Sequence, residues 1–195
     1  MLRSALASLD SSILEWMHRH ATPAGIAVCA AISHLGSPPA MTLLAFAGVF
    51  ALATLGEWIV LSGWVAAFSG AAWLDRWLKL AIHRPRPAYA AALLQHPTWS
   101  FPSGHALGSL VGYGMLAYVV ALLVRAPRRT KTLIVAGAAL LVAAIGLSRL
   151  YLGVHYLSDV LGGYAAGMLW LSLCIVGVET ARRWQRQDFT LNPTS

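Results

Sequence analysis

Three short clusters of polar residues interrupt a chain that is otherwise mostly apolar. In order, they are Lys79 to Arg86-Pro87, then Pro102-Ser103-Gly104-His105, then Ser148-Arg149 with His155 and Asp159. They contain lysine and arginine cations, imidazoles, a carboxylate and a Ser-Gly pair at the start of an apolar segment. Such groups can bind a phosphate and cleave it from an alcohol without a metal ion. They are costly near a bilayer, so their grouping indicates a function.

His155 and Asp159 have the spacing of a nucleophile and its partner. Residues four apart on a helix lie on the same face, so the carboxylate of Asp159 can accept a hydrogen bond from Nδ1 of His155. This bond fixes the tautomer whose free Nε2 can attack phosphorus, and it stabilises the positive ring that forms. Taken alone, the pair fits an ion pair on a helix surface equally well.

Arg149 ends the apolar segment before His155, and a few residues including Gly153 connect the two. The chain can therefore fold Arg149 back beside the nucleophile, where its planar guanidinium can bind two phosphate oxygens. The alternative for Arg149 alone is a side chain that extends to the membrane interface.

The tetrapeptide Pro102-Ser103-Gly104-His105 opens a long apolar segment. Proline and serine suit a helix start, and the free backbone N–H groups there attract an anion. Ser103 can donate its hydroxyl, and Gly104 lets a phosphate approach the main chain closely. His105 lies in the first turn, where it can give a proton to a departing alkoxide. The alternative is an ordinary N-cap beside an interfacial histidine.

Lys79 and Arg86 flank the end of another apolar segment. The Arg-Pro-Arg-Pro sequence that starts at Arg84 cannot continue a helix, so the chain turns and can direct both cations inward. His83 and Arg84 lie between them and can instead face lipid headgroups. Extension of the cations to the interface is the stronger alternative for this cluster alone.

The three clusters together resemble the tripartite signature of the type 2 phosphatidic acid phosphatase superfamily, in its bacterial membrane branch. The resemblance covers residues 79–167, and its signature positions are Lys79, Arg86, Pro87, Pro102, Ser103, Gly104, His105, Ser148, Arg149, His155 and Asp159. It implies a lipid phosphatase that needs neither a metal nor another cofactor, with its site at the extracytoplasmic face of the membrane. It also implies the catalytic and phosphate-binding roles that the spacing favours: His155 as nucleophile, Asp159 as its partner, His105 as acid and base, and Lys79, Arg86, Ser103, Gly104 and Arg149 as phosphate ligands.

Composition places these residues in a membrane protein. The 195 residues are 58% hydrophobic and only 11% charged, with a mean hydropathy of +0.65, whereas soluble domains carry about 25% charged residues. The net charge of +7 does not predict nucleic-acid binding, because the basic residues lie in the clusters, in the turn 125–131 and in the tail after residue 181. Cys29 and Cys174 both lie within apolar segments, where cysteine behaves as a small hydrophobic residue.

The apolar segments predict an all-α, polytopic transmembrane bundle. The predicted helices are 23–35, 39–55, 57–78, 103–124, 132–150 and 156–178, of which the last four have the length of a membrane span. Six spans are preferred, with five as the alternative because the first helix is short and a Gly-Ser-Pro-Pro turn follows it. Residues 1–22 are expected to form an amphipathic interfacial helix, 23–180 the phosphatase domain and 181–195 a basic cytoplasmic tail.

Basic residues indicate how the bundle lies in the membrane. If the turn 125–131 and the tail are cytoplasmic, as positively charged segments usually are, all three clusters emerge at the outer face of the cell membrane. The segment 88–100 is then an extracytoplasmic loop, with a short helix lying over the site. The remaining histidines, which are His18, His20, His34, His83 and His96, are expected to be interfacial or structural.

The predicted substrate is a lipid phosphate monoester or pyrophosphate that enters from the bilayer. Undecaprenyl pyrophosphate, phosphatidylglycerophosphate, phosphatidic acid and lysophosphatidic acid all fit, and an outward site slightly favours a polyprenyl carrier. A lipid phosphotransferase would use the same residues with an alcohol as acceptor. A non-catalytic lipid-binding or transport protein would not need His155, Asp159 and His105 together, and a vanadium-dependent haloperoxidase does not suit the small size and apolar spans. Oligomeric state is not predicted.

Overall fold

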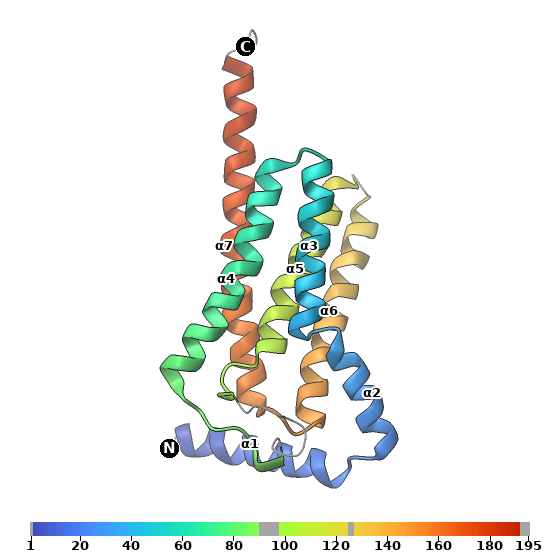
Figure 1. Cartoon of the computed structure of the whole chain (residues 1–195), viewed down its shortest axis with the longest axis vertical. Coiled ribbons are helices and arrows are strands. Elements are labelled where there is room, and N and C mark those ends of the chain that lie inside the picture. Colours follow the sequence, from blue (N-terminus) through green and yellow to red (C-terminus); the bar gives the residue numbers. More distant parts are fainter. Residues whose placement is uncertain (1, 90–97, 125–126, 192–195) are drawn as a thin grey trace.

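The computed structural model describes residues 2–89, 98–124 and 127–191, and these form seven α-helices (Figure 1). The helices are α1 Leu2–Arg19, α2 Pro23–His34, α3 Pro38–Thr54, α4 Trp58–Ile82, α5 Gly104–Leu123, α6 Arg128–Tyr151 and α7 Leu157–Leu191. No strand occurs among the described residues. The predicted all-α class is confirmed.

Five segments of the described chain are long and apolar enough to cross a membrane. They are Pro23–Thr54, Trp58–Ile82, Gly104–Leu123, Arg128–Tyr151 and Leu157–Gln187. The first segment joins α2 and α3, which follow one another in the same direction (Figure 1). The 12 residues of α2 extend about 18 Å, which is less than the hydrocarbon thickness. The structure therefore matches the lower of the two span counts that the sequence left open.

The break between α2 and α3 has a local cause. The side chain of Ser37 accepts a hydrogen bond from the backbone N–H of Ala40, and Pro38 occupies the first turn of α3. Both features start a new helix, because proline lacks the N–H that would continue the previous one. The predicted turn is present, and it joins two helices that run in the same direction (Figure 1).

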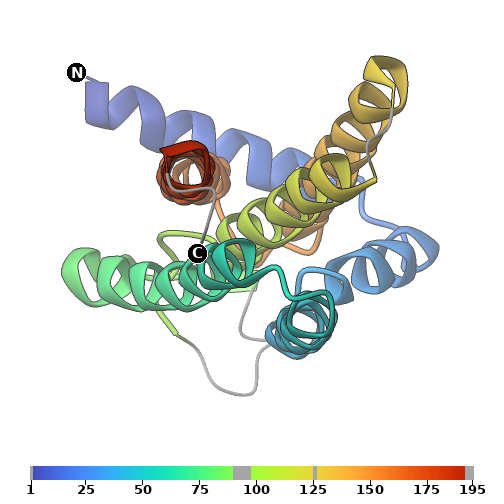
Figure 2. The same ribbon diagram turned by 90° about the horizontal axis from the view of Figure 1, so that it is seen from above.

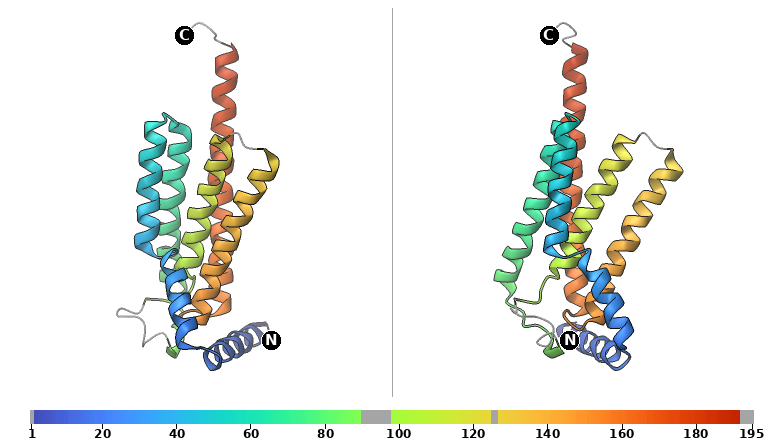
Figure 3. Two further views of the ribbon diagram at one scale, coloured as in Figure 1. Left: turned by 90° about the vertical axis from the view of Figure 1, so that its right-hand side faces the viewer. Right: turned by 45° about the vertical axis from the view of Figure 1, so that its right-hand side comes forward.

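The helix α1 lies across one end of the bundle, and the C-terminal end of α7 lies at the other end (Figures 1 and 2). Here α4 ends, α5 begins, α6 ends and α7 begins, so all the links that carry the polar clusters meet beside α1 (Figure 3). At the opposite end α7 projects beyond its neighbours (Figure 1). The fold thus brings three clusters that are distant in sequence to one end of the molecule.

The core lies around α5, which packs against α4, α6 and α7. Val60, Trp64, Leu107, Val111 and Met115 are at most 1% exposed in this core. Large apolar side chains also cover the outside of the spans, and they include Leu43, Phe46, Phe50, Leu133 and Leu140, each at least 70% exposed. Apolar outer faces of this extent fit contact with lipid rather than water.

Two contacts fix the start of α5 against the start of α7. The backbone N–H of Ser103 donates to the carbonyl oxygen of Asp159 at 3.0 Å. A Cβ on Gly163 would lie 2.8 Å from the carbonyl oxygen of Ser103, so only glycine permits this approach of the two backbones. The second and third clusters are therefore held together by the main chain as well as by side chains.

Candidate active site

The predicted site residues converge on one cavity of about 640 Å³. The six that line it are Lys79, Arg86, Gly104, His105, Arg149 and His155. They come from the end of α4, the segment after it, the start of α5, the end of α6 and the link before α7. Ser103 and Asp159 are fully buried and do not line the cavity.

His155 lies between α6 and α7 and is only 2% exposed. The chain reaches it through Gly153, whose φ of +67° turns the backbone after α6 in a conformation that favours glycine. Nδ1 of His155 lies 3.6 Å from Oδ2 of Asp159. Burial lowers the pKa of His155 from 6.5 to about 4, even though Asp159 acts in the opposite direction. The imidazole is therefore neutral at ordinary pH, as a nucleophile must be.

Asp159 is held by three hydrogen bonds. Its Oδ2 accepts from the hydroxyl of Ser100 at 2.6 Å and from the backbone N–H of Tyr156 at 2.9 Å. Its Oδ1 accepts from Nη1 of Arg84 at 2.7 Å. The Ser100 hydroxyl also lies 3.5 Å from Nδ1 of His155. Since the carboxylate is surrounded by donors, its orientation toward the imidazole is fixed before substrate binds.

Arg86 connects His155 to the segment after α4. Nη1 lies 3.2 Å from Nε2 of His155 and 3.0 Å from the carbonyl oxygen of Val154, to which it donates. Nε and Nη2 donate to the backbone oxygen and the hydroxyl of Thr98. Burial lowers the pKa of Arg86 below its ordinary value, but an arginine side chain still remains a cation.

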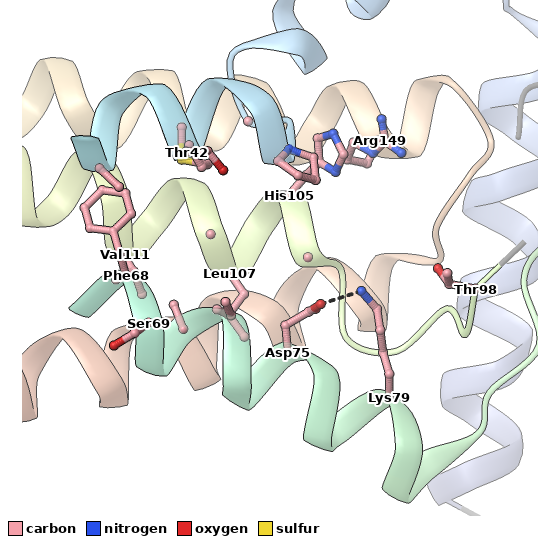
Figure 4. Close-up of a pocket in the computed structure, with 18 of the residues that line it drawn as sticks. Thr42, Phe68, Ser69, Asp75, Lys79, Thr98, His105, Leu107, Val111 and Arg149 are labelled. Atoms are coloured by element: carbon pink, nitrogen blue, oxygen red, sulfur yellow. Dashed lines mark hydrogen bonds and ion pairs between the residues drawn. The ribbon is translucent and has the colours of Figure 1, made fainter. Parts of the chain in front are cut away.

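His105 and Arg149 lie on one side of the cavity, opposite Asp75 and Lys79 (Figure 4). Arg149 is in the last turn of α6 and only 8% exposed. Its Nη1 donates to the hydroxyl of Ser33 on α2 at 2.5 Å, whereas its buried Nε has no hydrogen-bond partner among the described residues. Arg149 is thus fixed at one end and retains a donor for an anion.

Lys79 is paired within its own helix. Its Nζ lies 2.7 Å from Oδ2 of Asp75, and Oδ1 of Asp75 is buried without a hydrogen-bond partner in the described structure. A Cβ on Gly104 would lie 3.0 Å from that Oδ1 and 3.1 Å from Nζ of Lys79. Gly104 therefore leaves space at the point where this ion pair and the first turn of α5 meet.

Ser103 was expected to bind phosphate through its hydroxyl, but it does not line the cavity. Its Oγ accepts from the backbone N–H of Ala106 at 3.5 Å, as an N-cap does. This serine starts α5 and lies behind the residues that face the cavity. The hydroxyl contacts the first turn of α5.

Several residues of the site were not singled out from the sequence. They are Ser33, Asp75, Thr98, Ser100 and Arg84. For Arg84 the sequence analysis considered contact with lipid headgroups, whereas the structure pairs it with Asp159. Only Asp75 carried a signal, because it lies four residues before Lys79 in an apolar helix, where an ion pair is expected. Most of the predicted loop 88–100, on which a short helix was expected, falls on residues 90–97, which include His96 and lie outside the described residues.

The donors around the cavity are mainly cations and imidazoles. Within the described ranges, no three His, Cys, Asp or Glu side chains are grouped closely enough to hold a metal ion.

A protein family, a curated relative and solved structures match this chain. The model of the PAP2 superfamily matches residues 52–183. Phosphatidylglycerophosphatase B of Bacillus subtilis (strain 168) is 36% identical over 96 residues, which are 49% of this chain and 47% of that protein. The chain thus spans about half the length of the curated relative it matches.

Two solved structures share the fold. One is a transmembrane PAP2-type phosphatidylglycerolphosphate phosphatase from Bacillus subtilis, with a TM-score of 0.76, 30% identity and coverage of 90% of this chain and 87% of the other. The second is LpxE of Aquifex aeolicus, with a TM-score of 0.62, 22% identity and coverage of 86% and 94%. The likeness to LpxE concerns the fold alone.

Proposed function

This chain belongs to the PAP2 superfamily, and from that premise we propose that it is an integral-membrane lipid phosphatase. It hydrolyses a lipid phosphate monoester or pyrophosphate through a phosphohistidine intermediate. One observation carries the proposal: His155, backed by Asp159, opens into the same cavity as His105 and three cations. A nucleophile, an acid and a set of phosphate ligands are what this reaction requires.

The first step transfers the phosphoryl group to the protein. Nε2 of His155 attacks phosphorus, the bond from phosphorus to the lipid oxygen breaks, and protonated His105 gives its proton to the departing oxygen. Asp159 stabilises the positive charge that His155 acquires. In the second step His105 removes a proton from water, the resulting hydroxide attacks phosphorus, and the N–P bond breaks to release phosphate.

Cations stabilise the negative charge of the phosphoryl group in both steps. Lys79, Arg86 and Arg149 all line the cavity, so they can offset the charge on the phosphoryl oxygens as it moves through the transition state. The start of α5 adds free backbone N–H groups at Gly104 and His105. In this scheme Ser103 contributes by starting that helix rather than by touching phosphate.

The shape of the cavity supports a substrate with a long apolar chain. Beyond the cations it continues between α3, α4 and α5, where its lining includes Met41, Ala45, Phe68, Ala72 and Val111. Phe68 and Val111 lie at the far end from Arg149 (Figure 4). Phosphatidylglycerophosphate, phosphatidic acid and undecaprenyl pyrophosphate combine a phosphate with such a chain. The name of the Bacillus relative adds support for the first.

The proposed site faces the extracytoplasmic side of the cell membrane. Arg128, Arg129 and Lys131 start α6, and Arg182, with Arg183 next to it, forms an ion pair with Glu57 at the start of α4, so all five are at the end opposite the cavity. Positive charge favours the cytoplasmic side. The cations at the cavity end lie on the outer side, against this preference, because they bind an anion.

The test is phosphate release from a panel of purified lipids by detergent-solubilised protein. We expect His155→Ala to abolish turnover while the protein stays monodisperse, and His34→Ala, at an exposed histidine of α2, to retain it. Wild-type turnover by His155→Ala would refute the proposal. Transfer of phosphate to an added alcohol without release of free phosphate would assign the chain to the phosphotransferases instead.

A further inference from the structure

The helix α1 contributes a buried carboxylate to the region behind the nucleophile. Asp10 is only 4% exposed, whereas Leu6, Leu9 and Trp16 on the same helix are about half exposed. Oδ1 of Asp10 accepts from the backbone N–H of Ser158 at 2.9 Å, and Oδ2 accepts from Nη2 of Arg84 at 2.7 Å. Asp10 therefore faces the start of α7, while the apolar side of α1 is available to the membrane interface.

Arg84 bridges this carboxylate to Asp159. Its Nη2 donates to Asp10 while its Nη1 donates to Oδ1 of Asp159 at 2.7 Å. Its guanidinium also lies 4.3 Å from the ring centre of Tyr156, so the cation is held from several directions. Burial opposes the charge, but Asp10 and Asp159 outweigh it and raise the pKa of Arg84 above its ordinary value.

The Arg84 guanidinium thus binds two carboxylates, and this arrangement affects the charge around His155. Asp10, Asp159 and Arg84 together leave a net negative charge on the Nδ1 side of the imidazole, whereas Arg86 contacts Nε2. Without Asp10, Arg84 would neutralise Asp159 alone, and less negative charge would remain to stabilise the positive ring that forms when Nε2 is phosphorylated. Neither Asp10 nor Arg84 lines the cavity, so this effect concerns catalysis and not substrate binding.

We propose, building on the phosphatase function above, that Asp10 and Arg84 are positioning residues for the reaction at His155. Arg84 orients Asp159, and Asp10 holds Arg84 and balances its charge. The interfacial helix α1 therefore contributes a positioning residue to the active site. This helix lies outside residues 52–183, which the family model matches.

The proposal is tested with Asp10→Asn, which keeps the shape and the acceptor for the backbone N–H of Ser158. It removes the charge and the oxygen that accepts from Arg84 and from the Ser158 hydroxyl. We expect kcat to fall about tenfold or more while KM stays within about twofold, the pattern for a group that acts on the reacting atoms through other residues and does not touch substrate. The matched control is Glu15→Gln on the same helix, where an exposed ion pair with Arg19 is lost. This control should leave both constants within about twofold of the wild type.

The double variant Asp10→Asn with Arg84→Gln, measured beside Arg84→Gln alone, tests whether Asp10 acts through Arg84. If it does, the two losses of kcat should not multiply, and the double variant should have a kcat within about threefold of that of Arg84→Gln. Rates are normalised to monodisperse protein.

Two results would overturn the proposal: a kcat for Asp10→Asn equal to that of Glu15→Gln, or a double variant whose loss of kcat is the product of the two single losses. Either result combined with an inactive His155→Ala would leave the phosphatase function standing. An active His155→Ala would instead remove that function.

Discussion

Nη1 of Arg86 lies 3.2 Å from Nε2 of His155. Arginine can only donate, so Nε2 is the acceptor and the imidazole proton belongs on Nδ1, which faces Asp159 and Ser100. This is the tautomer that phosphoryl transfer requires. The same guanidinium can move its hydrogen bond from Nε2 to a phosphate oxygen when the nucleophile attacks.

Arg86→Lys is expected to lower kcat/KM by about 100-fold or more, the cost of losing one fixed donor at a developing charge. Lysine keeps the charge but cannot hold Thr98, Val154 and the imidazole together. Steady-state phosphate release measures the effect. Arg76→Lys, at an exposed position on α4, is the control and should change nothing. Equal rates for the two variants would contradict the role of Arg86.

Gly104→Ala is expected to lower kcat/KM by about 10- to 100-fold, because small displacements at a reacting centre are costly. The added Cβ would lie 3.0 Å from Oδ1 of Asp75 and 3.1 Å from Nζ of Lys79, so the ion pair must shift. Gly137→Ala is the control, since nothing lies within 4 Å of a Cβ there. The account fails here if both variants have the wild-type kcat/KM.

The low pKa of His155 predicts how the free enzyme responds to acid. Burial brings this pKa from 6.5 to about 4, so the neutral nucleophile persists as the pH falls through 6 and 5 and is lost only near 4. Nitrogen-15 NMR of labelled protein in detergent, compared with His155→Ala to assign the signal, measures this titration. A midpoint near the ordinary histidine value would contradict the burial that the structure assigns to this ring.

Removal of metal ions tests whether side chains alone supply the positive charge that stabilises the phosphoryl group. Since Lys79, Arg86 and Arg149 face the cavity, we expect the rate of phosphate release to be unchanged after extended dialysis against EDTA. The measurement needs a magnesium-dependent phosphatase as a positive control for chelation. Loss of activity with recovery on adding magnesium would show that a metal supplies part of the charge.

The convergence of the three clusters could be predicted from sequence because it follows from chain direction. Antiparallel spans deliver the end of α4, the start of α5 and the end of α6 to one end of the bundle, and His155 follows by a short link. The i, i+4 relation of His155 and Asp159 is equally local. The span count was left open, because a short helix followed by a proline turn fits either two crossings or one bent crossing.

The supporting contacts could not be predicted, because each joins ordinary residue types across long separations. Ser33 meets Arg149 from 116 positions away, and Asp10 meets Ser158 from 148 positions away. Nothing local distinguishes these side chains from other serines and carboxylates. Arg84 was assigned to headgroups for the same reason: the carboxylates that hold it are visible only in three dimensions.

Rapid-quench analysis of wild-type protein with a lipid substrate labelled in its phosphate tests the central claim most directly. We predict a covalently labelled protein that is stable in base and labile in acid, as an N–P bond is, with the label on His155. Its amount should rise when water attack is slowed in His105→Ala given a substrate with a good leaving group. Turnover with no labelled protein at any time in either enzyme, or with the label on another residue, would contradict the account.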